Sequence, residues 1–178
     1  MKVLVSGNRG YIGTMMVPML VRAGHQVTGL DTDFYARCTF GEDFNSVPFI
    51  KKDTRDVEPA DLAGFEAVIH LAALSNDPLG NLNHEITYDI NWRGTLHLAK
   101  TAKQAGVQRF LFSSSCSNYG AAGDNIIDEN AELNPVTPYG ISKVRAEQDL
   151  QKLADDRFSP VYLRSATVYG FSPRMRFD

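Results

Sequence analysis

Apolar and polar positions follow two different rhythms along this chain. Continuous apolar runs of strand length lie at residues 2–6, 26–30, 47–51, 67–71, 109–113 and 161–163. Three longer stretches repeat their apolar residues every three to four positions, as a helix with one buried face does: 11–23, 83–105 and 138–154. Strands that are apolar throughout are typical of parallel sheets covered on both faces. The alternation predicts an α/β fold built on a doubly wound parallel sheet.

Residues that cap or break helices support these boundaries. Gly24 and Gly106 follow the first two helical stretches, where glycine commonly ends a helix. Pro18 lies inside the first helix and predicts a kink. Thr137 is a candidate N-cap, and Pro138 suits a first helical position. A short helix is expected near residues 59–62, and irregular segments are expected at 31–46 and 120–136.

Residues suited to ligand binding follow the predicted strands. Gly7, Asp31, Asp53, Ala72 and Ser115 come directly after the first five strands in chain order. Right-handed crossovers place the carboxyl ends of parallel strands at one edge of the sheet, and ligands bind at that edge. The sequence therefore predicts one site that collects these residues.

The first turn of the chain is rich in glycine and leads from a strand into a helix. Its sequence is Gly7-Asn8-Arg9-Gly10-Tyr11-Ile12-Gly13. Glycines let the backbone turn tightly and let a pyrophosphate approach the helix N-terminus. The spacing is GxxGxxG instead of GxGxxG, and a simple turn is the alternative. We expect this turn to bind a dinucleotide cofactor through Gly7, Gly10, Tyr11, Ile12 and Gly13.

Asp31 ends the second strand, where a carboxylate binds the adenosine ribose hydroxyls and repels a 2′-phosphate. This favours NAD, with a solvated turn aspartate as the alternative. Arg9 complicates the choice, because a guanidinium in the glycine turn could bind a 2′-phosphate. NAD is the expected cofactor, and NADP stays open.

Further cofactor contacts are expected after the third and fourth strands. Asp53, with Thr54 beside it, could accept a hydrogen bond from the adenine amino group or could cap a helix. Leu71, Ala72 and Ala73 are small or apolar enough for the backbone to pass close to a flat cofactor.

Two polar residues have competing interpretations. Asn91 lies within a long helix, where asparagine is a poor helix former, and we count it among the cofactor-binding residues. It could bond a backbone carbonyl or water near Lys143, or face solvent. His70 is expected to be a hydrogen-bonded, partly buried histidine and not a catalyst.

Tyr139 and Lys143 lie four residues apart at the start of the last helical stretch. Residues at this spacing share one helix face, so the ammonium would favour ionisation of the phenol. An acidified tyrosine can remove or return the proton of an alcohol. We expect both residues to act in catalysis and to bind the cofactor.

A serine run, Ser113-Ser114-Ser115-Cys116-Ser117, follows the fifth strand. Ser115 could orient a substrate oxygen against Tyr139, and Ser113 could contact the cofactor; an ordinary loop is the alternative. Cys116 has no histidine partner that would activate it as a nucleophile.

Composition narrows the class of protein. The chain has 178 residues, 43% of them hydrophobic and 22% charged, with a net charge of −3, so no nucleic-acid partner is expected. No apolar run reaches membrane-spanning length, and no membrane partner is expected. The two cysteines are too few for a disulfide scaffold, which favours the cytoplasm. No metal site is expected.

Taken together, these motifs resemble the extended short-chain dehydrogenase/reductases, in the NAD-dependent nucleotide-sugar epimerase/dehydratase group. The likeness covers essentially the whole chain. It rests on the glycine turn, the Asp53 segment, Leu71-Ala72-Ala73, Asn91, Ser113-Ser114-Ser115, Tyr139-x-x-x-Lys143 and Leu163-Arg164 to Val168-Tyr169-Gly170.

The resemblance implies a Rossmann-like fold with tightly held NAD. Ser115 matches the active-site serine or threonine, Tyr139 the acid/base, and Lys143 the residue that binds the nicotinamide ribose and lowers the tyrosine pKa. It also implies a homodimer formed through residues 83–105 and 138–154.

The chain departs from this pattern in three places. Sugar 4,6-dehydratases place an Asp-Glu pair where this chain has Cys116 and Ser117, so that elimination is not expected. Through Arg9 in the glycine turn, the chain is similar to NADP-using reductase-epimerases. Family members are also longer, so residues 1–178 are expected to be a partial NAD-binding domain that largely lacks the C-terminal substrate-binding part.

The sequence therefore predicts an enzyme that epimerises a nucleotide sugar by transient oxidation of a sugar hydroxyl. An NAD(P)-dependent nucleotide-sugar reductase or oxidoreductase is one alternative. A dinucleotide-binding fragment without turnover is another.

Overall fold

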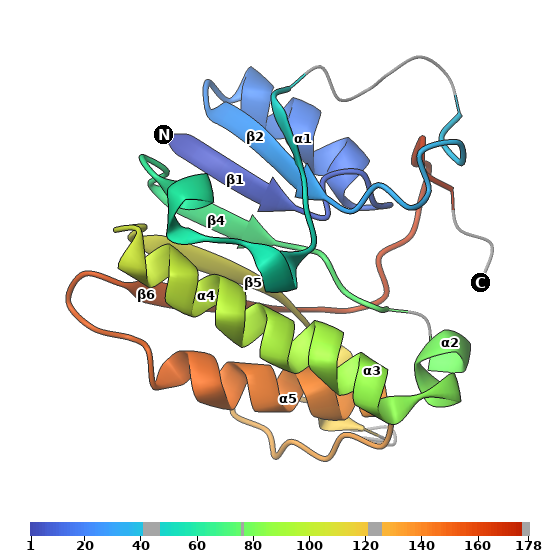
Figure 1. The fold of residues 1–178 in the computed structure, drawn as a ribbon. Helices are drawn as coiled ribbons and strands as arrows, with labels where there is room; N and C mark the ends of the chain where they lie inside the picture. Colours follow the sequence, from blue (N-terminus) through green and yellow to red (C-terminus); the bar gives the residue numbers. More distant parts are fainter. Residues whose placement is uncertain (41–46, 76, 121–125, 176–178) are drawn as a thin grey trace.

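The computed structural model describes residues 1–40, 47–75, 77–120 and 126–175. Within these ranges all strands join one parallel sheet in the order β3-β2-β1-β4-β5-β6 (Figure 1). The strands are β1 Lys2–Ser6, β2 Gln26–Asp31, β3 Phe49–Lys51, β4 Ala67–His70, β5 Arg109–Ser115 and β6 Ser159–Ser165. The strand order reverses between β1 and β4, which opens a crevice at the carboxyl edge. The predicted Rossmann-like α/β fold is confirmed.

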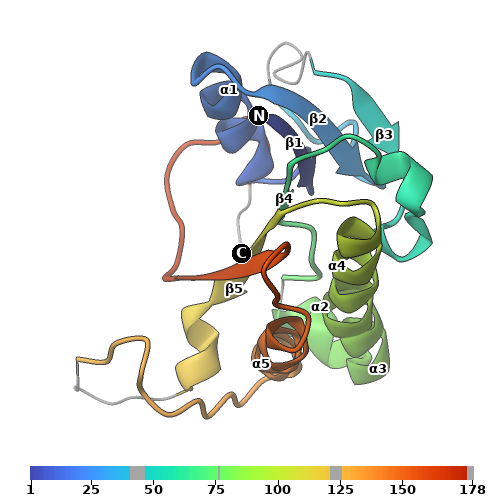
Figure 2. The same cartoon turned by 90° about the vertical axis from the view of Figure 1, so that its left-hand side faces the viewer.

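Helices cover both faces of this sheet. The α-helices are α1 Gly13–Arg22, α2 Asp77–Leu82, α3 His84–Tyr88, α4 Gly94–Gln104 and α5 Pro138–Gln151. Short 3₁₀ turns are η1 Thr54–Asp56, η2 Pro59–Leu62 and η4 Cys116–Tyr119, and η3 Asp89–Arg93 is a π-helical segment. Helix α1 lies on one face, and α4 and α5 lie on the other (Figure 2). In the described part of the chain, no helix combines the length and apolar character needed to cross a membrane.

Two apolar clusters hold these layers together. On one face, Leu98 of α4 and Leu150 of α5 belong to a buried cluster with Phe110 of β5. On the other face, Val17 of α1 packs with residues of β1, β2 and β4, among them Val5. Because the central strands contribute to both clusters, their apolar runs are continuous, as the sequence pattern predicted.

The helix predicted over residues 83–105 is present but not uniform. Helix α3 passes into the π-helical η3, which passes into α4 without a break. Asn91 lies in η3 and is fully buried. The π-bulge accommodates an extra residue in the helix, and such bulges are frequent at functional sites. Periodicity alone could not distinguish this segment from an α-helix.

Other boundaries differ by a few residues. The third strand begins at Phe49 instead of Val47, and α5 ends at Gln151 instead of residue 154. Helix α1 continues through Pro18 to Arg22. The predicted short helix at 59–62 is the 3₁₀ turn η2. The described part of the predicted loop, residues 126–136, contains neither helix nor strand; residues 41–46 and 121–125 lie outside the described residues.

Candidate active site

A large pocket of about 1490 Å³ opens at the carboxyl edge of the sheet. Glycines of the first turn, Asp31, Asp53, the loop after β4, the serine run and the start of α5 all contribute to its wall. Every predicted site residue except Asn91 lines this pocket: Gly7, Gly10, Tyr11, Ile12, Gly13, Asp31, Asp53, Thr54, Leu71, Ala72, Ala73, Ser113, Ser115, Tyr139 and Lys143. The topology thus gathers residues separated by more than a hundred positions.

The glycine turn fits tightly against its neighbours. Gly7 has φ +74°, and a Cβ added there would lie 2.6 Å from the backbone nitrogen of Ala72. A Cβ at Gly13 would collide with the carbonyl oxygen of Gly7. Only glycine allows this approach. Helix α1 begins directly afterwards, and its N-cap Ile12 provides no side-chain hydrogen bond, so the helix end suits an anionic group.

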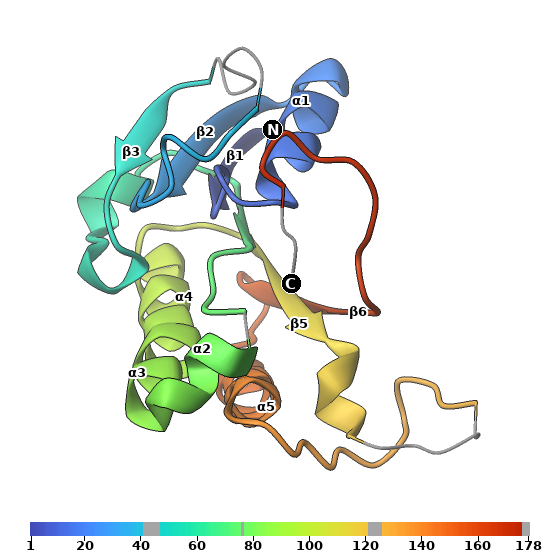
Figure 3. The same cartoon turned by 90° about the vertical axis from the view of Figure 1, so that its right-hand side faces the viewer.

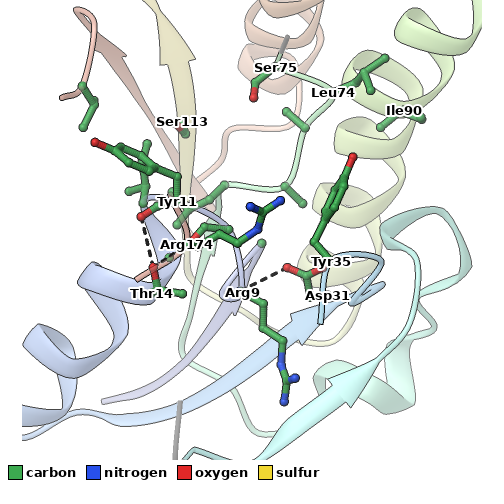
Figure 4. Close-up of a pocket in the computed structure, with 18 of the residues that line it drawn as sticks. Arg9, Tyr11, Thr14, Asp31, Tyr35, Leu74, Ser75, Ile90, Ser113 and Arg174 are labelled. Carbon is green, nitrogen blue, oxygen red and sulfur yellow. Dashed lines mark hydrogen bonds between the residues drawn. The ribbon is translucent and has the colours of Figure 1, made fainter. Parts of the chain in front are cut away.

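Asp31 connects the first turn to the loop after β2. Its Oδ2 accepts from the backbone nitrogen of Arg9 at 3.2 Å (Figure 4). Its Oδ1 accepts from the backbone nitrogen of Asp33 at 2.9 Å. The Arg9 guanidinium pairs with Asp33 at 3.1 Å and lies 4.0 Å from the centre of the Phe49 ring. Its side chain therefore points away from Asp31.

Asp53 caps a 3₁₀ turn, as one of its two interpretations predicted. Its carboxylate accepts from the backbone nitrogen of Arg55 at 2.9 Å and pairs with the Arg55 guanidinium at 2.8 Å. Hydrogen bonding from this guanidinium lowers the pKa of Asp53. Asp53 is also part of the pocket lining, so its role as a cap is compatible with a contact to a ligand.

Asn91 lies behind the pocket wall instead of within it. Its Oδ1 accepts from the backbone nitrogen of Leu74 at 2.7 Å, and its Nδ2 donates to the carbonyl oxygen of Leu74 at 2.9 Å. The bond to a backbone carbonyl agrees with the buried alternative that the sequence offered for this residue, and its contact with a cofactor stays a prediction. Asn91 fixes the loop after β4, which does line the pocket.

His70 connects three elements below the pocket. Its Nδ1 lies 2.6 Å from Ser6 Oγ of β1, and its Nε2 lies 2.8 Å from Thr95 Oγ1 of α4. Burial, with a smaller effect from the charge of Lys143, lowers the pKa of His70 to about 3. The residue is a hydrogen-bonded core histidine, more deeply buried than expected.

Helix α5 presents Tyr139 and Lys143 to the pocket. Thr137 caps the helix by accepting from the backbone nitrogen of Gly140 at 3.1 Å, and Pro138 occupies its first turn. The Lys143 Nζ lies 5.4 Å from the centre of the Tyr139 ring and 4.5 Å from that of Phe112. The two side chains therefore lie side by side, as the four-residue spacing predicts.

The Lys143 ammonium is buried and held in place. It donates to the carbonyl oxygen of Ser113 at 2.7 Å, and its residue is 2% exposed. Burial lowers the pKa of Lys143 to about 7, although the charge of Glu147 opposes this shift. An ammonium that titrates near neutrality beside a phenol is a suitable partner for general acid/base chemistry.

Ser115 lies where β5 ends and η4 begins. Its Oγ accepts from the backbone nitrogen of Ser117 at 3.1 Å and donates to Ser117 Oγ at 3.0 Å. It thus caps the turn that follows the strand and lines the same pocket as Tyr139. The serine run is both a loop start and part of the pocket wall.

A buried network behind the site was not predicted. Glu147 accepts from Ser114 Oγ at 2.5 Å and Asn118 Nδ2 at 2.9 Å, and pairs with Arg164 at 2.6 Å. This network ties α5 to β5 and β6. The signal in the sequence was the continued spacing of four from Tyr139 through Lys143 to Glu147.

The segment after β6 also forms part of the site and was not predicted. It returns to α1 (Figure 3), where Tyr11 Oη donates to the carbonyl oxygen of Gly170 at 2.5 Å and Ser172 Oγ donates to that of Tyr11 at 2.8 Å. Arg174 lies 4.5 Å from the centre of the Tyr35 ring and lines the pocket. Nothing in the sequence pattern indicates these contacts, because they join residues far apart in the chain.

The comparison with protein families gives one match over nearly the whole chain. The sequence profile described as the NAD dependent epimerase/dehydratase family matches residues 3–178. A UDP-glucose 4-epimerase of Neisseria meningitidis serogroup C is 35% identical over 176 residues, covering 92% of this chain and 52% of that protein. One from Streptomyces lividans is 33% identical over 149 residues, covering 82% and 45%. The chain spans about half the length of the curated relatives it matches.

Solved structures agree with this match. The UDP-glucose-4-epimerase of Stenotrophomonas maltophila, with bound NAD and formylated UDP-arabinopyranose, is 30% identical at a TM-score of 0.82, covering 92% of this chain and 52% of that one. MoeE5 in complex with UDP-glucose and NAD is 28% identical at a TM-score of 0.77, covering 91% and 52%.

Proposed function

We propose a function from the premise that this chain belongs to the NAD dependent epimerase/dehydratase family. We infer that it is the dinucleotide-binding domain, residues 1–178, of an enzyme that epimerises a nucleotide sugar. The reaction proceeds by transient oxidation of a sugar hydroxyl. The observation that carries this proposal is the shared pocket, which is lined by the adjacent Tyr139 and Lys143, by Ser115 and by the glycine turn.

The pocket residues fit a dinucleotide. The glycines at positions 7 and 13 leave a cradle that a Cβ would fill, at the N-terminus of α1, where a pyrophosphate would bind. Asp31 would bind the adenosine ribose, and Asp53 would bind the adenine. Lys143 would bind the nicotinamide ribose, and the loop at 71–73 would form the wall behind it.

When bound, NAD would supply the hydride chemistry by which a sugar carbon is oxidised and then reduced again from the other face. Tyr139 holds and moves the proton of the sugar hydroxyl, and Ser115 orients the same oxygen by hydrogen bonding. Lys143 favours the ionised phenol through its charge. These three residues are the catalytic set of the proposal.

The proposal extends to partners. The solved relatives named above carry UDP-sugars, and we propose a nucleotide sugar as the substrate of this chain. We also propose a homodimer that uses the outer surfaces of α3, α4 and α5. Light scattering on the purified chain tests the assembly, and a monomer at all concentrations would contradict it.

Turnover assays test the reaction. The protein is incubated with NAD and UDP-glucose, UDP-galactose or UDP-N-acetylglucosamine, while sugar epimers and nicotinamide absorbance are followed. Epimers that form without a net change in absorbance would support the proposal. A stoichiometric change in absorbance would instead indicate a reductase or oxidoreductase.

A second candidate is a dinucleotide-binding module without turnover. The observation that favours it is the pocket lining, which gathers the residues assigned to the dinucleotide, in a chain that spans about half the length of the curated relatives it matches. Tight NAD binding, with no conversion of any nucleotide sugar, would support this candidate over the first.

A further inference from the structure

Arg9 is a cation at the end of the pocket assigned to adenosine. Its backbone nitrogen donates to Asp31, and the residue is part of the pocket lining. In Rossmann-like sites a carboxylate here binds the ribose hydroxyls of NAD, whereas a nearby arginine accommodates the 2′-phosphate of NADP. The chain therefore has a carboxylate suited to NAD, that of Asp31, and a guanidinium suited to NADP, that of Arg9, at the same end of the pocket.

Asp33 engages this guanidinium directly. Its Oδ2 lies 3.1 Å from Arg9 Nη1, and the side chains of the two residues are 31% (Arg9) and 12% (Asp33) exposed. The ring of Phe49 also contacts this guanidinium, and its centre lies 4.0 Å from Arg9 Cζ. A partly buried pair that also stacks on an aromatic ring is held more firmly than an exposed pair.

The backbone fixes Asp33 in this position. Asp33 has φ 59°, the only positive φ outside glycine in the described ranges. Its backbone nitrogen donates to Oδ1 of Asp31, whose other oxygen accepts from the backbone nitrogen of Arg9. One carboxylate thus anchors the backbone of both members of the ion pair. The pair is built into the two turns themselves.

We propose that Asp33 is a specificity-determining residue that selects NAD over NADP. Its carboxylate is paired with the Arg9 guanidinium, which a 2′-phosphate would need as its partner. It also adds a second negative charge near Asp31. The inference rests on the proposed function only in placing adenosine at Asp31. The residue that discriminates between NAD and NADP in this proposal, Asp33, lies just after the end of β2.

The test is a binding measurement, independent of turnover. Asp33→Asn keeps the shape of the side chain and a residue type that tolerates positive φ. Calorimetric titration of Asp33→Asn is expected to show NADP⁺ binding at least about tenfold tighter than to the unchanged chain, since charge-assisted bonds to phosphate are strong. Binding of NAD⁺ is expected to change less than about threefold.

Two further variants make the result specific. Asp156→Asn removes the same charge from an exposed turn outside the pocket and should leave the ratio of the two affinities unchanged. Combining Asp33→Asn with Arg9→Met should cancel the gain, because the freed guanidinium is gone. An Asp33→Asn variant without tighter NADP⁺ binding, or a double variant that keeps the gain, would overturn the inference.

The outcomes also separate the two proposals. Binding of NAD⁺ with the predicted switch, but no sugar epimers, would contradict the epimerase and leave the role of Asp33 intact. If the unchanged chain binds neither NAD⁺ nor NADP⁺, the assigned cofactor site and the inference are both wrong.

Discussion

The buried ammonium of Lys143 contributes to the pocket but lowers the stability of the fold. Its ammonium lies against Phe112 and Tyr139 and donates to the carbonyl oxygen of Ser113. Desolvation lowers its pKa from 10.5 to about 7. An amine that titrates near neutrality can change its charge when a neighbouring phenol gains or loses a proton. For stability alone, an apolar residue would suit this buried position better.

The cost of this burial predicts a pH-dependent stability. Below pH 7 the amine is charged in both states, so the folded chain carries the whole penalty. Between about pH 7 and 10.5 the unfolded chain binds more protons, so stability rises with pH. Lys143→Met is expected to raise the free energy of unfolding by roughly 1 to 3 kcal/mol near pH 6.

Chemical denaturation of the cofactor-free protein at several pH values checks this prediction. The gain from Lys143→Met should shrink as pH rises through the alkaline range. Lys152→Met is a matched control, because that ammonium is 73% exposed and its removal should change stability little at any pH. A gain that is independent of pH would show that the lysine charge is not its cause.

Tyr139 and Lys143 have separable contributions in the proposed reaction. Tyr139→Phe removes only the hydroxyl, so turnover is expected to fall by about a hundredfold or more while the NAD dissociation constant changes little. Lys143→Ala should impair both quantities, because this residue is assigned to the cofactor and to the phenol. Steady-state kinetics combined with calorimetry distinguishes these patterns. Full activity of Tyr139→Phe would remove the tyrosine from the mechanism.

At the scale of elements, the helix from α3 to α4 does more than cover the sheet. Its π-helical segment directs Asn91 to the backbone of Leu74, which fixes the loop after β4. Periodicity predicted the helix, since apolar spacing is a local property. The π-bulge depends on which distant backbone groups the buried Asn91 amide contacts, and the apolar periodicity of the sequence could not predict those contacts.

Asn91→Leu tests this connection. It leaves the nitrogen and carbonyl oxygen of Leu74 without their partners, so we expect a loss of about 1 to 3 kcal/mol in the free energy of unfolding. Weaker NAD binding should accompany it, because the loop lines the pocket. Calorimetry and denaturation measure both effects.

The control for this variant is Asn83→Ala. Asn83 caps α3 by accepting from the backbone nitrogen of Ile86, and it does not line the pocket. Its loss should cost about 1 kcal/mol of stability without weakening NAD binding. Equal binding losses in both variants would indicate a general loosening of the helix and would contradict a specific role for Asn91.

At the scale of the whole molecule, the segment after β6 connects the two halves of the sheet. Ser172 is 1% exposed; its Oγ donates to the carbonyl oxygen of Tyr11 and lies 3.0 Å from Thr14 Oγ1. The pocket wall therefore includes residues from both ends of the sequence. The face of β6 on the α1 side is less covered, with Val161 at 40% and Leu163 at 43% exposed.

Ser172→Val is expected to weaken this connection. The substitution removes the hydroxyl and leaves the Tyr11 carbonyl without that donor, which should cost about 1 to 3 kcal/mol. Hydrogen exchange should then accelerate in residues 170–175 and at the start of α1. Val168→Ala, at a half-exposed position of the same segment, should leave exchange near α1 unchanged. Unchanged exchange in Ser172→Val would show that other contacts hold the segment.

The sequence by itself determined the strands, the main helices, the glycine turn and the spacing of Tyr139 and Lys143, because these features depend on neighbours within a few positions. Crossover rules then brought most site residues to one edge. Only the tertiary structure decided that Arg9 pairs with Asp33, that Asn91 lies behind the pocket wall, and that the buried Glu147 pairs with Arg164. Each of these contacts depends on which residues from distant parts of the sequence meet in the folded chain, and the local pattern does not encode that.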